Sequence, residues 1–576
     1  MNIFAVFKRH IDKILQDLVA ESALPDGMDT SKIAVEPPRD ASHGDISTNA
    51  AMVLSKAAKM APRDIAALIT DKLHKLDDVS NCSIAGPGFI NITVQPVLWS
   101  NILQDILQQG TSFGDSTLGK DQNVNVEYVS VNPTGPMHIG HSRVAIVGDV
   151  VASLLQKAGY TVTKEFYIND AGGQADQLAR SLYGRYCQEL GQADAELGEY
   201  PADYLIAPAK KLAERDGDKW LGKDISEWMD PVRSFAIDEM MDMIRQDLDI
   251  IGIHHDVFAS EKAIIESGGI ETAFKILNDK GLIYQGTLPK PKGIEVDDWE
   301  PRELTLFRTT EFGDDSDRPL KKSDGSWTYV TGDIAYHNDK IKRGFNRIVN
   351  VWGSDHVGYV KRMAAATNAL SDGRVSMEAI LCNMVHFMDN GVAVKMSKRA
   401  GTFVTMADVI DRVGRDVVRF IMLTRKNDIP LEFDFAKVVE QSKDNPVYYV
   451  QYAHARSCSI RRHVEETFPG ARVDQADLSL LTREEDIAMM KTLAQWPRQV
   501  EVAAQAEEPH RIAFFLYEVA SQFHALWTKG KGEAELRFVY PNDKELTLAK
   551  LALVQAVATV IASGLDVMGV TPAEEM

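Results

Sequence analysis

The segment from residue 124 to residue 168 constrains the fold most strongly. It contains a β-rich alternating run, VNVEYVSV (124–131), then the Pro/Gly loop NPTGP, a long helical pattern from His138 to Lys157, and the run TVTKEFYI (161–168). A strand, a helix and a second strand within about 45 residues are the beginning of a parallel, doubly wound sheet. Such sheets bind ligands at the carboxyl ends of their strands, where NPTGP and Asn169-Asp170 follow.

The chain of 576 residues is too long for one core, so we expect several domains. Residues 1–115 mix helical and strand-like patterns and predict a small N-terminal α/β domain. Residues 116–435 predict the parallel sheet, interrupted by helical patterns at about 180–300. Residues 436–576 are helical and predict a C-terminal all-α bundle. The predicted fold class is therefore α/β and multidomain, with a doubly wound parallel, Rossmann-like sheet and a helical insertion.

Strand-like runs return after the insertion. WTYVTGDIAY (327–336) is rich in aromatic and β-branched residues, and so is RIVNVWGSD (347–355). We expect Asp333 to end the first of these strands on the ligand side of the sheet.

Charge is distributed unevenly along the chain. The net charge of −20 argues against nucleic-acid binding, because neutralising phosphates requires Lys and Arg. Between Ile341 and Lys426, however, 14 Lys and Arg outnumber 7 Asp and Glu. A basic segment on an acidic body can direct a polyanion to one face, whereas charges scattered around helices would form no patch.

Cysteine use and hydropathy exclude several protein classes. Cys82, Cys187, Cys382 and Cys458 lie far apart without a CxxC pair, which argues against a disulfide framework or a thiolate zinc site. No window has about 18 uninterrupted apolar residues, and the amphipathic N-terminal helix pattern lacks a signal-peptide cleavage site. We therefore expect a cytoplasmic protein that does not associate with membranes.

A histidine pair follows the first predicted strand. His138-Ile139-Gly140-His141 comes directly after the Pro/Gly loop, so both imidazoles lie on one face of the first helical turn. Free backbone N–H groups and the helix dipole favour an anion there, and Gly140 allows a nucleotide to approach closely. This arrangement suits nucleotidyl transfer, which depends on positioning and charge stabilisation. Alone, the pattern is equally compatible with a capping or metal-ligating histidine pair.

A basic motif, Lys395-Met396-Ser397-Lys398-Arg399, comes after the β/α pattern resumes and before Gly401. Cations on such a loop suit contact with leaving phosphates. Alone, a Lys/Arg cluster is more typical of a solvated surface loop.

The two motifs together, in this order and at βα junctions, resemble the HIGH and KMSKS elements of class I aminoacyl-tRNA synthetases. The string VNPTGPMHIGHSR resembles arginyl-tRNA synthetases in particular, and GDISTNAA, GPGFIN, YINDAGGQ, WTYVTGDIAY and VYYVQYAHAR extend the resemblance over nearly the whole chain. The HIGH region comprises Val131, Asn132, Pro133, Thr134, Gly135, Pro136, Met137, His138, Ile139, Gly140 and His141. Both lysines of the second element are present, and Arg399 replaces its last Ser.

The resemblance implies an arginine–tRNA ligase acting in cytoplasmic translation. Such enzymes form arginyl-adenylate from L-arginine and ATP with Mg²⁺, and then transfer arginine to the 3′-terminal adenosine of tRNA(Arg). The substrate carboxylate attacks, so no protein nucleophile is needed, and we expect no tightly bound protein metal. The family also requires bound tRNA before activation.

Catalytic and ATP-binding roles carry over residue by residue. By resemblance, His138 and His141 hold the ATP phosphates, with Gly140 beside them, and Lys395 and Lys398 stabilise the departing pyrophosphate. Some relatives carry glutamines after the next strand, where this chain has Gly353-Ser354-Asp355-His356. Asp355 and His356 are therefore candidate contacts to the adenosine of ATP or to arginine.

The arginine site is implied in the same way. A guanidinium is a planar fork of donors, and its matching partner is a carboxylate that accepts two parallel bonds. Glu127 and Asn132 match positions that contact the α-amino and α-carboxyl end, Tyr329 and Asp333 match those that contact the guanidinium, and Glu261 is a second carboxylate. From the residues alone, Glu127 could equally be a strand residue paired with a lysine, and Tyr329 a core residue.

Consequences for specificity follow from paired carboxylates. Shorter or uncharged amino acids would leave buried acids unpaired, so editing is dispensable. Asn169, Asp170 and Gln174 are expected to shape the pocket rim.

For tRNA, the family uses its C-terminal bundle at the anticodon and its N-terminal domain at the elbow. The matched elbow residue is Asn91, in GPGFIN. Aromatic and basic side chains of the bundle can stack on anticodon bases or meet phosphates; the candidates are Tyr448, Tyr449, Gln451, Tyr452, Arg456, Arg461 and Arg462. The family also implies a monomer.

Three alternative functions fit these residues less well. A cysteine or glutamate class I synthetase would need a thiolate zinc pocket or a basic side-chain pocket. A nucleotidyltransferase that does not use tRNA would lack the helical C-terminal bundle. A non-enzymatic RNA-binding paralogue is disfavoured by the intact His138, His141, Lys395 and Lys398.

Overall fold

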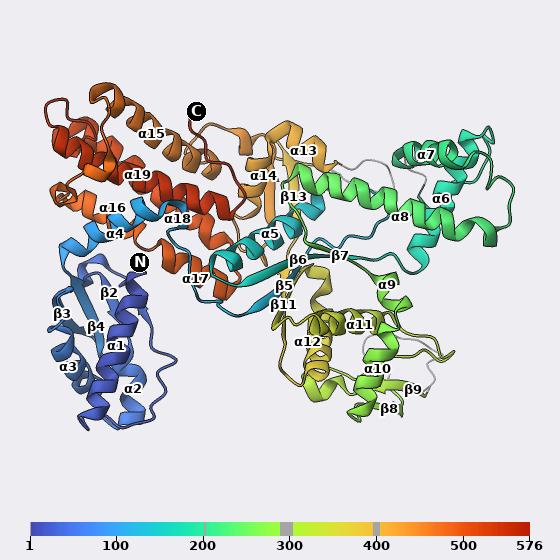
Figure 1. Cartoon of the computed structure of the whole chain (residues 1–576), viewed down its shortest axis with the longest axis horizontal. Helices are drawn as coiled ribbons and strands as arrows, with labels where there is room; N and C mark the ends of the chain where they lie inside the picture. The colour runs from blue at the N-terminus through green and yellow to red at the C-terminus, as the bar shows by residue number, and fades with distance from the viewer. Residues whose placement is uncertain (1, 201–202, 289–302, 395–403) are drawn as a thin grey trace. The chain divides into compact units, whose positions relative to one another are not determined.

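A computed structural model describes residues 2–200, 203–288, 303–394 and 404–576. The described residues form two compact units (Figure 1). One unit comprises Met1–Ser116, Gln441–Ala506 and Arg511–Met576, and the other comprises Thr117–Glu440 and Glu507–His510.

A parallel sheet organises the second unit. Its strands pair in the order β12-β11-β5-β6-β7, and each neighbouring pair is parallel. Their bounds are β5 Asn123–Glu127, β6 Thr161–Ile168, β7 Val257–Ser260, β11 Arg347–Gly353 and β12 Ser376–Cys382. The chain proceeds from β5 to one side and later returns to its other side at β11. This reversal confirms the predicted doubly wound sheet and puts the expected ligand site at the carboxyl ends of β5 and β11.

The first crossover helix follows the predicted pattern. The helix α5 (Ser142–Lys157) connects β5 to β6 and is buried along most of its length. A Cβ atom on Gly148 would lie 2.3 Å from Cβ of Tyr128, so glycine is needed for the close approach of this helix to the end of β5.

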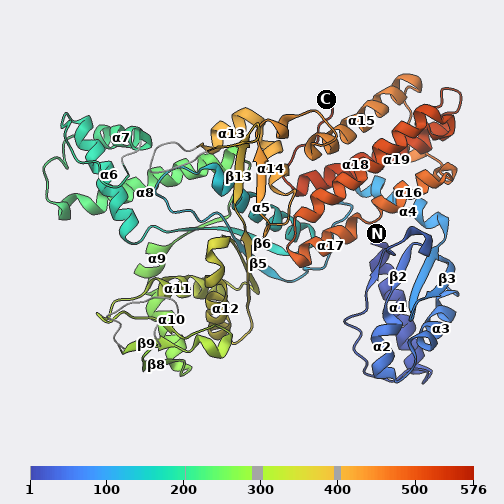
Figure 2. The same ribbon diagram turned by 180° about the vertical axis from the view of Figure 1, so that it is seen from behind.

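The predicted insertion is helical up to Ile250. It comprises α6 (Gly173–Glu189), α7 (Ile206–Asp216) and α8 (Ile225–Ile250), and α6 and α7 both pack against α8 (Figures 1 and 2). The chain then returns to the sheet, because β7 pairs with β6 from Val257 to Ser260. This edge strand is short and half-exposed, so its sequence lacks a clear apolar run.

The strand predicted at WTYVTGDIAY is wrong. Residues Tyr329–Lys342 form the helix α11, and Asp333 therefore lies in a helix rather than at a strand end. Nearly all residues from Thr331 to Lys340 are buried or half-buried. A run that is covered on several sides carries no clear helical period, and its β-branched and aromatic residues then suggest a strand.

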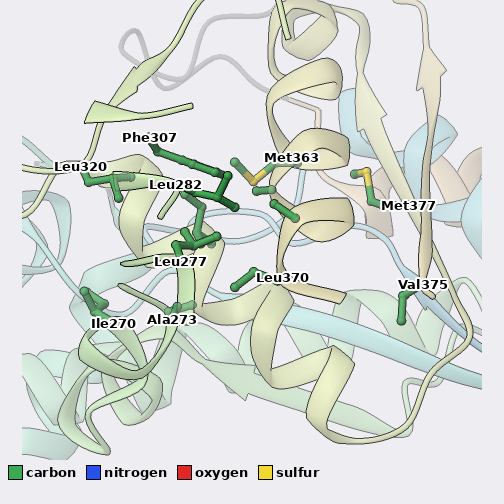
Figure 3. Close-up of a cluster of buried hydrophobic side chains, with 14 of the residues drawn as sticks. Ile270, Ala273, Leu277, Leu282, Phe307, Leu320, Met363, Leu370, Val375 and Met377 are labelled. Atoms are coloured by element: carbon green, nitrogen blue, oxygen red, sulfur yellow. The ribbon is translucent and has the colours of Figure 1, made fainter. Parts of the chain in front are cut away.

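A hydrophobic cluster supports α11 (Figure 3). Ile334 and Ala335 of α11 pack among buried side chains that include Leu277, Phe307 and Met363. The cluster is built from α11, β11, β12, α10 (Gly269–Asp279), α12 (Val357–Ser371), and the antiparallel strands β8 (Ile283–Gly286), β9 (Leu304–Phe307) and β10 (Arg318–Pro319) with the segments beside them. Fully burying each Leu, Phe or Met contributes about 1.5–3 kcal/mol, so the cluster fixes α11 firmly.

A smaller sheet is formed by strands that lie on both sides of the lysine motif in the sequence. Its strands β14 (Val392–Ala393), β13 (Val385–Asp389) and β15 (Leu431–Asp434) pair in that order. The helices α13 (Met406–Val413) and α14 (Arg415–Met422) lie between β14 and β15 in the sequence. Thr405 caps α13 by accepting the backbone N–H of Asp408.

The other unit contains the predicted N-terminal α/β region and the C-terminal helices. The N-terminal elements are α1 Ile3–Ala20, β1 Val35–Glu36, β2 Ile46–Thr48, α2 Ala50–Ala58, α3 Pro62–Leu73, β3 Val79–Ala85, β4 Phe89–Val94 and α4 Pro96–Gln109. The strands form an antiparallel sheet in the order β1-β2-β4-β3. The C-terminal helices are α15 Pro446–Thr467, α16 Glu484–Leu493, α17 Trp496–Ala506, α18 His510–Gly532 and α19 Lys544–Val567.

In the described part of the chain, one helix is long and apolar enough to cross a membrane by length and composition alone. This helix is α19, whose most apolar window has a mean hydropathy of 1.8, yet 78% of that window is buried inside the protein. Such burial is typical of the core helix of a bundle.

Candidate active site

The two histidines of the HIGH segment form a reciprocal cap. His138 Nδ1 accepts the N–H of Gly140 at 3.1 Å, and His141 Nδ1 accepts the N–H of His138 at 3.3 Å. The rings stack with centroids 3.7 Å apart. Because each Nδ1 accepts, each neutral ring carries its proton on Nε2. The helix-capping role that the sequence left open is therefore present. It puts an N–H donor suited to a phosphate oxygen on Nε2 of each ring.

Lys395 and Lys398 lie outside the described residues, as does Gly401. The residues directly after this segment are described, and they lie against the HIGH segment. Ile139 N–H donates to the carbonyl of Val404 at 3.3 Å, and His138 and Thr405 form an antiparallel bridge. The chain thus brings the C-terminal flank of the lysine motif to the histidine pair.

Two buried arginines join α5 to later segments. Arg419 of α14 donates to Asp149 of α5 at 2.5 Å, and Asp149 also accepts from Lys164 at 2.8 Å. Arg143, at the beginning of α5, donates to the carbonyls of Asn383, Lys426 and Ile429. The helix that follows HIGH is thereby fixed to segments on either side of the lysine motif in the sequence.

Asp333 and Glu261 form the acidic part of the site. Burial, and the nearby charge of Glu127, raise the pKa of Asp333 to about 6, against the hydrogen bond that Tyr359 Oη donates to its carboxylate and the positive charge of Arg362. Burial and the charge of Asp333 raise the pKa of Glu261 to about 7. Among the described residues, neither carboxylate forms an ion pair with Lys or Arg. The two acids together therefore favour a cationic ligand.

Tyr167 marks the point where the acids converge. Burial raises the pKa of its hydroxyl, and so do the charges of Asp333, Glu261, Glu127 and Asp170. Its ring stacks on Tyr336 with centroids 4.0 Å apart, and its hydroxyl is buried without a hydrogen-bond partner in the described parts of the chain. An unsatisfied buried hydroxyl beside acids fits the polar end of a substrate.

Asp170 positions Glu261. Its carboxylate accepts Ser260 Oγ at 2.6 Å and the N–H of Lys262 at 2.8 Å, so it contacts the residues on both sides of Glu261. Asn169 donates to the carbonyl of Ser130 at 3.4 Å. Gln174 is exposed near the beginning of α6.

Glu127 is buried at the end of β5 and already has a cationic partner. Its Oε2 accepts Lys340 Nζ at 2.6 Å, which is the lysine pairing that the sequence left open, and its Oε1 accepts Ser130 Oγ at 3.1 Å. Lys340 also donates to Asn350, which contacts His337. A buried polar network thus connects β5, α11 and β11 behind the acidic site.

The other predicted contacts lie nearer the surface. Asn132 is exposed in the loop before HIGH, and Tyr329 is 82% exposed one helical turn before Asp333. Asp355 and His356 lie on the turn after β11, where His356 Nε2 is 3.5 Å from Asp355 Oδ2. They lie at the carboxyl end of the strand beside β5, as expected for ligand contacts.

Sequence reasoning missed Ser130, Tyr167 and Tyr359. Tyr167 could have been found from its place at the carboxyl end of a predicted strand. Ser130 could not, because its role depends on backbone conformation: Val129 has φ 71° and Ser130 has φ 39°. A β-branched residue rarely adopts this left-handed region. The N–H of Tyr167 donates to Ser130 Oγ at 3.0 Å and helps to hold the turn.

In the other unit, the proposed RNA contacts differ in exposure. Asn91 is only 6% exposed in β4, whereas Phe89 of the same strand is 39% exposed. Tyr452 stacks on Tyr448, and the guanidinium of Arg456 lies 4.4 Å from the Tyr452 ring centroid. Tyr449 contacts the ring of Tyr517, and Arg461 and Arg462 are exposed. Gln451 instead has a structural role, because its side chain bonds the backbone of Thr571 and Ala573.

Within the described ranges, no group of three or more His, Cys, Asp or Glu side chains is placed to hold a metal ion. The cysteines are buried and not disulfide-bonded.

The chain matches known protein families along most of its length. The family model described as "tRNA synthetases class I (R), catalytic domain" matches residues 102–456, the arginyl-tRNA synthetase N-terminal domain matches residues 5–94, and the DALR anticodon binding domain matches residues 450–576. The fold is similar to Thermus thermophilus arginyl-tRNA synthetase, with a TM-score of 0.74 at 19% identity and full coverage of both chains. It is also similar to Mycobacterium tuberculosis methionyl-tRNA synthetase, with a TM-score of 0.53 at 12% identity, covering 77% of this chain and 91% of that one.

The parallel sheet with HIGH after its central strand thus defines a class I aminoacyl-tRNA synthetase. The arginine–tRNA ligases of Rhodospirillum rubrum and Ruegeria pomeroyi are 52% and 53% identical to the chain, over 591 and 580 aligned residues and the full length of both proteins in each case. The chain belongs to the arginyl-tRNA synthetase family, as its motifs predicted.

Proposed function

We propose that this protein is an arginine–tRNA ligase. It forms arginyl-adenylate from L-arginine and Mg-ATP and transfers arginine to the 3′-terminal adenosine of tRNA(Arg). The observation that carries this proposal is the pair of carboxylates, Asp333 and Glu261, which lack a Lys or Arg ion-pair partner among the described residues. They lie in a class I fold whose other predicted contacts suit a nucleotide.

For the nucleotide, His138 and His141 donate from Nε2 to ATP phosphates, and Gly140 leaves space beside them. Lys395 and Lys398 stabilise the departing pyrophosphate; the pairing of Val404 with Ile139 supports this role, because it brings the flank of their segment to HIGH. Asp355 and His356 contact the adenosine. Mg²⁺ enters with ATP as part of the substrate and neutralises phosphate charge.

For the amino acid, Asp333 pairs with the guanidinium and Glu261 supplies a second negative charge. Tyr329 covers the side chain from the surface. Glu127 and Asn132 lie at the α-amino and α-carboxylate end, where Glu127 also keeps its bond to Lys340.

For tRNA, we propose three functional regions with the predicted bounds. Residues 1–115 contact the elbow through the hairpin that carries Asn91, and the exposed ring of Phe89 suits stacking there. Residues 116–435 carry out the chemistry. Residues 436–576 bind the anticodon with Tyr452, Arg456 and Arg461. We further propose a cytoplasmic monomer.

Amino-acid specificity tests the function directly. We expect arginine alone, among the twenty amino acids, to be attached to unfractionated bacterial tRNA, because a neutral side chain would leave Asp333 and Glu261 without an ion-pair partner. Incorporation of radiolabelled amino acids into acid-precipitable tRNA measures this. Arginine-dependent pyrophosphate exchange should need added tRNA. Charging with another amino acid, and none with arginine, would refute the proposal.

Arginine affinity should depend on pH. As the pH falls from 8 to 5, Glu261 and then Asp333 gain protons, around their pKa values of about 7 and about 6. A neutral carboxyl pairs poorly with a guanidinium, so KM for arginine should rise about tenfold per pH unit for each acid below its pKa. KM for ATP should change less, and Glu261→Gln should make the arginine profile shallower. A KM for arginine that is constant from pH 8 to 5.5 would contradict this.

As the pH falls over this range and arginine affinity decreases, the contribution of these two acids to the stability of the folded protein should increase. Both acids have a higher pKa in the folded protein than when unfolded, so the folded state binds more protons as the pH falls from about 7 to 4. These two groups therefore stabilise the empty protein on acidification. A loss of arginine affinity there is not explained by their effect on folding.

A further inference from the structure

The backbone directly before the histidine pair is bound by side chains of the helical insertion. Tyr204 Oη donates to the carbonyl of Thr134 at 2.6 Å. Met137 N–H donates to Asp247 Oδ2 of α8 at 2.7 Å. The short segment from Thr134 to Met137, which ends beside His138, is thus fixed at both ends by residues far away in the sequence.

Asp247 is a buried acidic residue whose carboxylate accepts a hydrogen bond from a neutral backbone N–H group, which is unusual. It is 8% exposed, and among the described residues it pairs with no basic side chain. Burial raises its pKa to about 6, against the bond from Met137 N–H. Burying a carboxylate without a cation is costly, so a purely structural position would be better filled by a neutral residue. The charge gives a shorter and stronger bond to the backbone than a neutral acceptor would.

Tyr204 acts on the same segment through both shape and hydrogen bonding. A Cβ atom on Gly135 would lie 3.0 Å from Tyr204 Cζ, so the phenol packs directly on this glycine. The hydroxyl bond and the ring contact together fix where the loop turns towards HIGH.

The helix α8 connects this contact to the rest of the insertion. Its beginning lies with α6 and α7, and it also packs against α13, the helix that begins after Thr405 (Figures 1 and 2). Asp247 lies near its C-terminal end, one turn before Ile250. The C-terminal end of α8 thus contacts the loop before HIGH. The helix α8 also contacts α13, which follows the lysine motif in the sequence.

We propose that Asp247 and Tyr204 are positioning residues for adenylate formation: they hold the backbone from Thr134 to Met137 so that His138 and His141 meet the ATP phosphates in the reactive geometry. They touch the backbone of the loop rather than substrate. The helical insertion therefore controls the HIGH segment through two hydrogen bonds. This inference rests on the proposed arginine–tRNA ligase function.

The test compares Asp247→Ala, Asp247→Asn and Tyr204→Phe with Asp249→Ala in the full-length protein. Asp249 is a matched control on the same helix, with its side chain 75% exposed. Steady-state arginylation gives kcat and the KM values for ATP and arginine, and thermal unfolding gives Tm. Asp247→Asn keeps an acceptor for Met137 N–H, and Tyr204→Phe keeps the packing on Gly135.

Asp247→Ala should lower kcat about 30-fold, the effect of losing one charge-assisted hydrogen bond that positions the reacting groups. KM for ATP and arginine should change less than about threefold, because ground-state contacts remain. Asp247→Asn keeps an acceptor but loses the charge, so it should recover only part of kcat. Tyr204→Phe should lose about fivefold, and Asp249→Ala should match the unmodified protein.

The proposal is overturned if Asp247→Ala has the same kcat as Asp249→Ala, or if Asp247→Asn is as impaired as Asp247→Ala. It is equally overturned if only KM changes. Should Asp247→Ala fail to fold, Asp247→Asn and Tyr204→Phe decide by the same criteria. An unmodified protein that does not arginylate tRNA refutes the proposed function itself, whereas normal arginylation by all variants refutes only the positioning role.

Discussion

Asp333→Asn should reduce kcat/KM for arginine by roughly 10²- to 10⁴-fold. Removing one partner of a buried charge pair costs about 3–5 kcal/mol, and each 1.36 kcal/mol is a factor of ten in rate. The asparagine has nearly the shape of the acid and still accepts from Tyr359, so the loss measures the missing charge rather than a cavity. Arginylation kinetics at saturating ATP and tRNA give the value.

Asp339→Asn is the matched control for this change. Asp339 lies on the same helix, with its side chain 42% exposed and paired with Arg343, and exposed pairs contribute little. Its kinetics should remain within about twofold of the unmodified protein. Equal kinetics for the two variants would remove Asp333 from the arginine site, and a change confined to KM for ATP would reassign it.

Lys340→Met should destabilise the catalytic unit by about 3–5 kcal/mol, because it leaves Glu127 as a buried charge without its cation. The Lys340 side chain is fully buried, with its ammonium 2.6 Å from Glu127 and 4.3 Å from the Tyr336 ring centroid. The midpoint of thermal unfolding should fall by roughly 6–10 °C. Differential scanning calorimetry can assign the fall to one of the unfolding transitions.

A second substitution distinguishes charge from packing. In the Lys340→Met protein, Glu127→Gln removes the uncompensated charge and should restore at least half of the lost stability. If the double variant is as unstable as Lys340→Met alone, lost packing rather than the buried charge explains the effect. Arginylation by the double variant shows separately whether the charge of Glu127 is needed for substrate binding.

The position of the HIGH segment could be predicted from the sequence because the evidence is local. A strand, a Pro/Gly loop and a helix follow one another, and the rule for parallel sheets then gives the ligand side. The same reasoning put Asn169 and Asp170 at a strand end. The C-terminal helices were equally clear, since long apolar patterns at helical spacing are seldom ambiguous.

The helix that carries Asp333 could not be predicted in this way. Its sequence has strand-forming residues, and one side contacts the sheet through Tyr336 and Lys340 while another packs on the hydrophobic cluster. Burial on several sides removes the alternation that separates helix from strand. Asp333 still lies near Glu261 and Tyr167, and the spacing Y-x-x-x-D puts it one helical turn after Tyr329.

Contacts between distant segments were also beyond sequence reasoning. Asp247 and Met137 are 110 residues apart, and Tyr204 and Thr134 are 70 apart. Neither pair has a local pattern, since an aspartate within an acidic helix resembles its solvated neighbours. Only the packing of α8 on the loop distinguishes Asp247 from Asp249.

The hydrogen bonds that Arg143 donates between α5 and later segments affect how the protein responds to acid. Its guanidinium bonds carbonyl oxygens, which do not titrate in this range, and the charges of Arg419 and Lys164 keep the pKa of Asp149 low although burial opposes this. Mild acidification therefore neutralises Glu261 and Asp333 while these connections persist. The enzyme should lose affinity for arginine reversibly, at a pH well above the one at which it unfolds. Returning it to neutral pH should therefore restore activity without refolding.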